Sequence, residues 1–427
     1  MNKSGDSRMT GSKWLRIGTP LMLGLFVAYL DRTTLSVALP GVAEDLGFAG
    51  ERFSMTAGWA LTAFLIGYAV ANFFGGMLTR NIDAKKVVIW TFAIWSAATV
   101  YVGFTHSLVA LLACRLILGL AEGVYWPQQS RFAKAWFAPG ERTKANAVVQ
   151  YYGQFGAMAL GFILLTPLYN MAGWRVMFVV MGAIGLVGIV PLFIAALRPE
   201  SEAPYAPAST SGPRHSKPLT FASLGGYPFL LLLFSYVMQG MLFWGVTLWI
   251  PLAVKSVGFS GMSQAVASSL PYLMAVVLAW PISRISDRTG KRVLIASLGL
   301  LIPGVLMMLL PTVDSGYAKL ALITLALGYY ASSYSPNIWS ILQSTIEPES
   351  IGSASGIING IGAGGGGTLA GLLVGALYRN TGSYMPGFVT LGALVILGGV
   401  ALLAYGRLMN TRRAAPTGES TTRNVRV

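Results

Sequence analysis

The chain has 427 residues, of which 54% are hydrophobic and only 11% are charged. Soluble globular proteins carry about 25% charged residues, so this composition excludes a soluble enzyme with a solvated surface. It also excludes a disordered chain, because such chains are poor in hydrophobic residues. One cysteine, Cys114, excludes a disulfide framework, and two histidines are too few for a histidine-based metal cluster.

Apolar stretches recur along the whole chain, and each is long enough to cross a bilayer, which takes about 20 residues. Polar residues separate them into twelve stretches. They predict an all-α membrane protein with transmembrane helices at 16–39, 53–79, 85–104, 108–130, 143–167, 174–197, 227–254, 264–283, 292–311, 317–342, 351–378 and 385–407.

Residues 198–226 form the longest polar stretch and contain several prolines and serines, which is typical of a flexible linker. They divide the chain into one six-helix bundle at 16–197 and another at 227–407, with tails at 1–15 and 408–427. Pro127 and Pro336 lie 209 positions apart in the fourth and tenth stretches, which indicates that the halves are repeats. Two six-helix repeats are a common transporter plan, with the binding site at midplane between them.

Basic residues predict the orientation of the chain. With both termini in the cytoplasm, the inner segments hold 23 Lys and Arg residues and the outer segments hold 5. Cytoplasmic loops carry an excess of Lys and Arg, so we expect the termini and the linker to be cytoplasmic. The same split accounts for the formal net charge of +15 without a nucleic-acid partner.

Four charged residues lie inside the predicted spans: Asp31 and Arg32 in the first, and Arg115 and Glu122 in the fourth. A charge at the bilayer centre costs roughly 2.5–3.5 kcal/mol, so all four must pair, face water or change protonation. Arg115 and Glu122 are seven residues apart, which predicts that both face one cavity at different depths. The alternative is a set of interhelical salt bridges that only hold the first half together.

The four charges sum to zero when all are ionised. A bound carboxylate substrate would leave the site negative by one, and protonation of Asp31 or Glu122 would restore neutrality. Anion and proton then favour each other's binding, which is the thermodynamic basis of symport. A proton also cancels the electrical cost of importing a monoanion, about 2.3 kcal/mol per 100 mV. We therefore expect protons as the coupling ion, one or two per substrate, and no cofactor.

Several motifs resemble known transporters. The twelve stretches, the central linker and the loop Ser286-Asp287-Arg288-Thr289-Gly290-Lys291-Arg292 resemble the major facilitator superfamily. More specific likenesses to its anion:cation symporter family are Tyr29-Leu30-Asp31-Arg32 and Arg115-x6-Glu122-Gly123-x3-Pro127. That family includes bacterial galactonate and hexuronate transporters and is similar to sialin and the vesicular glutamate transporters.

The resemblance implies roles for the charged residues. Arg32 would bind the substrate carboxylate, and Asp31 and Glu122 would carry protons. Arg115 would pair with Glu122 or take part in gating. Gating is also the role implied for the loop residues Asp287 and Arg288.

The resemblance also implies a neutral pocket. Tyr29 and Tyr68 would line its N-terminal side, while Gln239 and Asn359 would contact substrate hydroxyls from the C-terminal side. We add Trp339, because an aromatic ring suits either a sugar face or an aromatic acid. Further polar and aromatic candidates lie on the fifth, seventh and tenth stretches. They are Gln150, Tyr151, Tyr152 and Gln154, then Tyr236, Trp244 and Trp249, and then Ser332, Ser333, Tyr334, Ser335 and Asn337. The alternatives are interhelical hydrogen bonds for the amides and interfacial belts for the tryptophans.

Two further features concern the gates. In the loop after the second stretch, Arg80 stands where the family has Asp, and Asp83 stands where it has Gly. The family's Asp latches the inner gate, so either Asp83 substitutes for it or the latch is weak. The glycine run at 360–367 in the eleventh stretch predicts close helix packing or a hinge.

Together these features predict a monomeric, proton-coupled importer of a small organic anion in a bacterial inner membrane, working by alternating access. Sugar acids such as aldonates or hexuronates are the first candidate substrates, and aromatic carboxylates are the second. Organic-anion exchange and a non-transporting receptor are the alternatives. An enzyme is not expected, because the sequence contains no nucleophile with a base and no metal-binding spacing.

Overall fold

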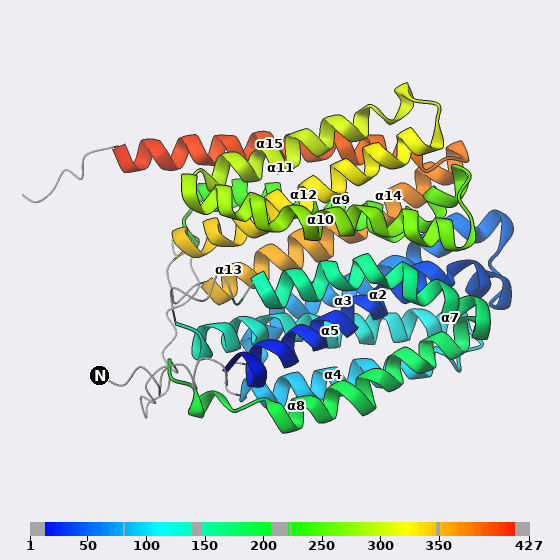
Figure 1. Cartoon of the computed structure of the whole chain (residues 1–427), viewed down its shortest axis with the longest axis horizontal. Coiled ribbons are helices and arrows are strands. Elements are labelled where there is room, and N and C mark those ends of the chain that lie inside the picture. The colour runs from blue at the N-terminus through cyan, green and yellow to red at the C-terminus, as the bar shows by residue number, and fades with distance from the viewer. Residues whose placement is uncertain are drawn as a thin grey trace, which may run out of the picture.

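The computed structural model describes residues 13–79, 82–138, 145, 147–205, 221, 224–346 and 351–414. Every element within these ranges is helical (Figure 1). In the first half the elements are η1 (Trp14–Gly18), α2 (Thr19–Asp45), η2 (Gly50–Arg52), α3 (Phe53–Leu78), α4 (Ala84–Val102), α5 (Leu108–Trp136), η3 (Ala147–Tyr152), α7 (Gly153–Ala183), η4 (Ile184–Ile189), α8 (Val190–Ala196) and η5 (Glu200–Glu202). In the second half they are α9 (Tyr227–Ser256), α10 (Gly261–Thr289), α11 (Arg292–Met308), η6 (Leu310–Thr312), α12 (Gly316–Thr345), α13 (Ile351–Ile357), η7 (Ile358–Gly365), α14 (Gly366–Thr381) and α15 (Met385–Ala414).

Within the described residues, nine helical runs are long and apolar enough to cross a membrane. They do not include α4 and α12, and one of them, Gly153–Glu202, covers two of the predicted stretches. Gly173 breaks that run with φ 76° and ψ 172°. This is a backbone conformation that glycine adopts without the steric penalty of a Cβ. The polar gap predicted around 168–173 is thus reduced to a break at one residue.

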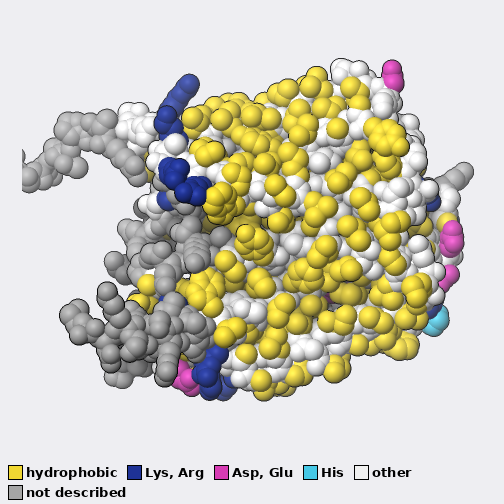
Figure 2. All heavy atoms as spheres, viewed as in Figure 1, with side chains coloured by type: hydrophobic (Ala, Val, Ile, Leu, Met, Phe, Trp, Pro, Cys, Tyr) yellow, Lys and Arg dark blue, Asp and Glu magenta, His cyan; other side chains and the backbone are white. Residues whose placement is uncertain are grey.

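The long helices run side by side along one direction, with the first half of the chain below the second in this view (Figure 1). Hydrophobic side chains cover the middle of the visible face, and Lys and Arg gather at the end where the N-terminus lies (Figure 2). An apolar belt between polar ends is the surface expected of a helix bundle in lipid.

Glycines let α3 and α5 cross closely. A Cβ at Gly119 would lie 2.0 Å from the Phe64 carbonyl oxygen, and one at Gly67 would lie 2.4 Å from the Leu116 carbonyl oxygen. Small residues at a crossing allow two backbones to approach, as is common between membrane helices. This crossing brings Tyr68 on α3 beside Glu122 on α5.

The predicted glycine run forms η7 and the start of α14, which are inserted between the two halves. A Cβ at Gly364 would lie 2.6 Å from Ala69 of α3, and one at Gly362 would lie 2.4 Å from Tyr236 of α9. Close packing is therefore one role of this run, and the hinge stays a prediction. The run positions Asn359 at the interface between the halves.

The start of the predicted linker packs on the first half. Glu200 pairs with Arg131 of α5, with Nε 2.9 Å from Oε1 and a second contact between Nη2 and Oε2. The Asp83 carboxylate accepts from the backbone N–H of Lys85 at 2.8 Å and of Glu200 at 3.1 Å. The remaining linker residues 206–220, 222 and 223 lie outside the described residues, as do the tails 1–12 and 415–427.

Candidate functional site

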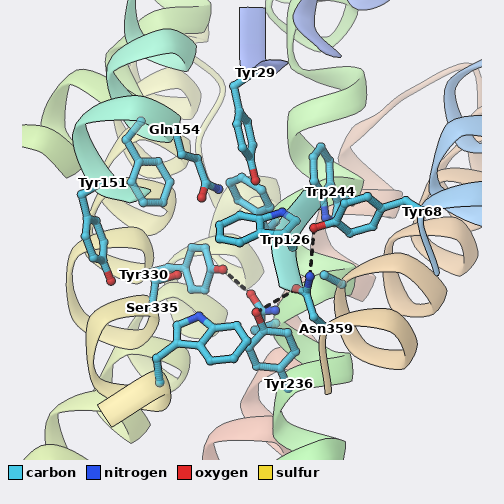
Figure 3. A pocket seen from close by; sticks show the side chains of 15 residues that line it. Tyr29, Tyr68, Trp126, Tyr151, Gln154, Tyr236, Trp244, Tyr330, Ser335 and Asn359 are labelled. Atoms are coloured by element: carbon cyan, nitrogen blue, oxygen red, sulfur yellow. Dashed lines mark hydrogen bonds between the residues drawn. The ribbon is translucent and has the colours of Figure 1, made fainter. Parts of the chain in front are cut away.

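A cavity lies between the two halves, and its interior, open solvent included, measures about 550 Å³ (Figure 3). Of the described residues that line it, ten are aromatic and none is charged. The lining residues are Tyr29, Tyr68, Trp126, Tyr151, Gln154, Phe155, Tyr236, Gln239, Phe243, Trp244, Tyr330, Ser335, Trp339, Asn359 and Ala363. The elements that supply them are α2, α3, α5, η3 and α7 from the first half and α9, α12 and η7 from the second.

Five residues predicted to contact substrate line this one cavity: Tyr29, Tyr68, Gln239, Asn359 and Trp339. The first and the last of them, Tyr29 and Asn359, lie 330 positions apart in the chain, and only the tertiary fold brings the five together. Arg32, the sixth, is not among the described residues that form the wall. It lies directly behind the wall.

Asn359 connects the two halves through hydrogen bonds. Its Nδ2 donates to the Tyr68 hydroxyl at 2.9 Å and to Asn72 Oδ1 at 3.0 Å, both on α3. Its Oδ1 accepts from the Tyr236 hydroxyl of α9 at 3.4 Å. The Tyr330 hydroxyl of α12 donates to Gln239 Oε1 (Figure 3). The amides therefore make interhelical hydrogen bonds and line the cavity at the same time.

Arg32 is held by an ion pair and by aromatic rings. Its Nε and Nη2 lie 2.7 Å and 2.6 Å from Glu122 Oε2, and the two side chains are 5% and 2% exposed. The guanidinium carbon lies 4.2 Å from the Tyr29 ring centre, 4.9 Å from that of Tyr68 and 5.4 Å from that of Trp244. These three rings separate the guanidinium from the cavity, and a cation over an aromatic face is stabilised electrostatically.

Of the two roles that the resemblance implies for Arg115, the structure does not show the pairing with Glu122, and gating stays a prediction. Glu122 pairs with Arg32, and the Arg115 guanidinium lies 5.3 Å from the Phe64 ring centre, with no partner for Nε or Nη1 among the described residues. Seven helical residues separate two side chains by about 10 Å along the axis, which is too far for a contact. Nor do Arg115 and Glu122 face the cavity, since neither is among the described lining residues.

Asp31 points toward α4, away from Arg32. Its Oδ2 accepts from the Thr99 hydroxyl at 2.7 Å, and its Oδ1 has no partner in the described part of the chain. Adjacent helical residues point about 100° apart, which explains why Asp31 and Arg32 have different neighbours.

Several polar atoms of the buried charged residues have no hydrogen-bond partner among the described residues. Among the described residues, Arg32 Nη1, Glu122 Oε1 and Asp31 Oδ1 have no hydrogen-bond partner, like the two Arg115 nitrogens. Buried polar groups without partners are rare and costly, and they call for a functional explanation. One explanation is that these atoms receive protons or an anion during a working cycle.

The structure describes only some of the residues that were predicted to take part in gating. The side chain of Asp287 and the whole of Arg80 lie outside the described residues. Arg288 is exposed in the last turn of α10, and the described residues include no ion pair to it. Next to it, the buried Ser286 hydroxyl bonds Asn337 Oδ1 of α12. The carboxylate of Asp83 caps α4 and contacts the linker, and both contacts lie within the first half.

Some wall residues were not anticipated from the sequence: Trp126, Phe155, Phe243 and Tyr330. Trp126 follows Glu122 by four positions, so helical periodicity alone places it on the same face of α5. Tyr330 lies 91 positions from its partner Gln239, and no local pattern indicates that pairing. In the described residues, no cluster of three His, Cys, Asp or Glu side chains could hold a metal ion.

Comparison with known proteins agrees with this architecture. Residues 21–370 match the sequence profile of the Major Facilitator Superfamily. A probable sulfoacetate transporter of Cupriavidus necator is 29% identical over 406 residues, covering 91% of this chain and 93% of that protein. A hexuronate transporter of Bacillus subtilis is 26% identical over 425 residues, covering 94% and 97%.

Solved structures share the fold at lower identity. A bacterial homologue of the human lysosomal transporter Spinster, in an inward-facing and unoccupied conformation, superposes with a TM-score of 0.71 at 16% identity. The match covers 98% of this chain and 100% of that one. The human organic anion transporter TETRAN gives a TM-score of 0.68 at 19% identity, with 91% and 99% covered.

Proposed function

Because the chain belongs to the major facilitator superfamily, we propose that it imports a small organic anion together with protons by alternating access. The named relatives are transporters, and the chain is a transporter rather than an enzyme. The substrates in the names of these relatives, sulfoacetate and hexuronate, are both organic anions and support an anionic substrate here.

The observation that carries the proposal is the Arg32–Glu122 ion pair directly behind the cavity wall. The Glu122 carboxylate forms with the Arg32 guanidinium the kind of ion pair that a substrate carboxylate would form. Protonation of Glu122 removes its charge and leaves Arg32 free to attract an anion through the rings of Tyr29, Tyr68 and Trp244. A second carboxylate, Asp31, offers a second proton site. Proton and anion binding then reinforce each other.

The proposal includes twelve membrane spans in two six-helix repeats, 16–197 and 227–407, joined by the linker 198–226, which would move against each other in alternating access. Cytoplasmic termini follow from the split of basic residues, and we place the protein in the inner membrane of a bacterium as a monomer. Each transport cycle must then break the bonds from Asn359 to Tyr68 and Asn72, because these residues come from opposite halves.

Two substrate classes are candidates for the site. Sugar acids such as aldonates or hexuronates are the first candidate from the sequence, and aromatic carboxylates are the second. Both bring a carboxylate for Arg32. They differ in what the neutral wall must supply, because a sugar acid carries several hydroxyls and an aromatic acid carries a flat ring.

Uptake by purified protein in liposomes tests the proposal. We expect that an inward proton gradient drives accumulation of a labelled organic anion, and that collapsing the gradient abolishes it. Protein-free liposomes are the control for leakage. Uptake that needs internal anion but no proton gradient would establish exchange instead, and binding without any uptake would establish a receptor.

A further inference from the structure

One face of α5 carries buried polar atoms that have no hydrogen-bond partner among the described residues. Seven such atoms belong to five of its side chains: Arg115, Glu122, Trp126, Gln129 and Trp136. Each helical residue turns the chain by about 100°, so these five positions fall within a sector of about 80°. No other helix in the described part of the chain carries as many such atoms. Because they share one face, one explanation should cover them together.

This face runs from the Arg32–Glu122 pair toward the end of α5 that we place in the cytoplasm. Along the helix axis, Trp126 lies about 6 Å beyond Glu122, Gln129 about 10 Å and Trp136 about 21 Å. The Trp126 ring lines the cavity and lies in the middle of the side chains in Figure 3. The face therefore passes the cavity wall on its way from the ion pair to the inner end of the helix.

Gln129 is the most unusual residue on this face. It is 3% exposed, and neither its Nε2 nor its Oε1 has a partner among the described residues. The preceding residue, Gln128, is fully bonded by comparison: its Nε2 donates to the Thr79 hydroxyl at 2.7 Å, and its Oε1 accepts from Arg131 at 2.8 Å. A buried amide without partners is rare and costly, so Gln129 calls for a functional explanation.

An amide with both polar atoms unpartnered is suited to hold water. Its oxygen accepts one hydrogen and its nitrogen donates another, and buried waters bond polar groups that lack other partners. The indole N–H groups of Trp126 and Trp136 can only donate. Of the three neutral side chains with unpartnered atoms on this face, only Gln129 can do both. It can therefore orient a chain of waters in one direction along α5.

Glu122 is the one proton site on this route among the described residues. Asp31 faces Thr99 on α4, where its Oδ2 accepts at 2.7 Å. Arg115 lies about 10 Å from Glu122 in the opposite direction along the helix. Between Glu122 and Gln129 the sequence of α5 contains no charged residue. A proton that leaves Glu122 toward the cytoplasm thus meets neutral groups only.

We propose that Gln129 is a positioning residue for the proton, and that it holds the water through which the proton of Glu122 leaves toward the cytoplasm. The unpartnered Oε1 of Glu122 gives its proton to the nearest water, and each water passes one proton on to the next. The carboxylate, negative again, restores the ion pair with Arg32. Gln129 keeps its own hydrogens throughout. The proposal rests on the proposed function, because it assumes that Glu122 carries a proton in each cycle.

The variant Gln129→Leu tests this inference, since it removes both amide atoms and keeps a similar volume. In proteoliposomes we expect proton-driven uptake to be slower on the order of tenfold, the effect on a rate of one lost hydrogen bond to a charged group. Exchange of internal for external anion should stay close to the parent's, because the loaded carrier can return with its proton still bound. The probes are labelled sulfoacetate, glucuronate and benzoate, and the variant is measured with those that the parent accumulates.

Further measurements separate this role from a structural one. Heavy water should slow uptake by Gln129→Leu more than uptake by the parent, because proton release limits the variant. The thermal midpoint should not fall, since Leu replaces a buried amide without partners. Gln129→Asn keeps a donor and an acceptor and should recover part of the rate. Ser269→Ala removes another buried hydroxyl without a partner, on α10, and is the matched control that should transport as the parent does.

The outcomes distinguish this inference from the function on which it rests. Parental proton-driven uptake in Gln129→Leu would overturn the role of Gln129 and leave the transport function standing. An equal fall in uptake and exchange would also overturn it, because Gln129 would then act on the anion or on the fold. A parent protein that accumulates none of the three anions under a proton gradient would sink the proposed function, and this inference with it.

Discussion

Arg32 contacts one carboxylate and several aromatic rings. Glu122 neutralises its charge, and the rings of Tyr29, Tyr68 and Trp244 shield it from the cavity. Removing one partner of a buried ion pair typically costs about 3–5 kcal/mol, because the other charge is left uncompensated. A proton on Glu122 has the same electrostatic effect on Arg32, and a substrate carboxylate can then replace the lost counter-charge.

Replacement of Glu122 by Gln tests this exchange of partners. Gln still accepts a hydrogen bond from Arg32 but cannot bind a proton, so uptake should no longer rise as the external pH falls from about 8 to about 6. Exchange of internal for external anion should be partly retained. Initial uptake rates over a pH series in proteoliposomes measure this. Glu44→Gln, at an exposed carboxylate, should keep the parental profile, and a parental profile in Glu122→Gln would contradict the coupling role.

Replacement of Arg32 tests the carboxylate clamp. Arg32→Ala should abolish binding of the organic anion, because it removes the positive charge nearest to the described cavity wall. Arg32→Lys keeps the charge but not the planar group that stacks on Tyr29, so we expect binding weakened on the order of tenfold or more. Titration calorimetry measures both. Arg16→Ala, at an exposed arginine, is the control, and retained affinity in Arg32→Ala would refute the clamp.

Helix crossings decide which charges meet. The glycines of α3 and α5 allow the two backbones to touch, which places Tyr68 on α3 near the Arg32–Glu122 pair. The glycine run in η7 similarly brings Asn359 within 2.9 Å of Tyr68. The geometry of the site therefore depends on glycines at the helix crossings, which carry no side chain of their own.

Substitution at the α3–α5 crossing should disturb both stability and binding. The methyl group in Gly119→Ala would lie 2.0 Å from the Phe64 carbonyl oxygen, so the helices must separate. Overpacking of this kind costs about 1–3 kcal/mol, which should lower the thermal midpoint in detergent by several degrees. The matched variant Gly188→Ala has no atom within 4 Å of the added methyl and should melt like the parent. Equal midpoints for the two variants would show that the crossing tolerates expansion.

At the scale of the whole molecule, charge is distributed between two ends and one internal cluster. Lys and Arg gather at the end near the N-terminus on the face shown in Figure 2, and hydrophobic side chains cover the middle. The internal cluster of Asp31, Arg32, Arg115 and Glu122 is neutral in total when ionised. In the transport cycle that we propose, a proton balances the charge of the anion as it passes through the apolar bundle.

Labelling of single cysteines tests the orientation. Lys291 and Ser315 are exposed at opposite ends of α11, so Lys291→Cys should react with an impermeant thiol reagent only from the cytoplasmic side and Ser315→Cys only from outside. Intact cells and inside-out vesicles provide the two sides. The native Cys114 is buried and gives the unreactive background. Reaction of Lys291→Cys in intact cells would invert the proposed topology.

The sequence by itself determined the membrane class, the family resemblance, the four internal charges and ten residues of the cavity wall. Hydropathy, helical periodicity and short motifs are local properties, so a single chain displays them. Only the tertiary structure decided that Glu122 pairs with Arg32 rather than Arg115, and that Arg32 lies behind the wall. The same is true of Trp126 and Tyr330 in the cavity. These contacts depend on how helices cross, and the crossings are set by backbone contacts such as that between Gly119 and Phe64, which are distant in sequence.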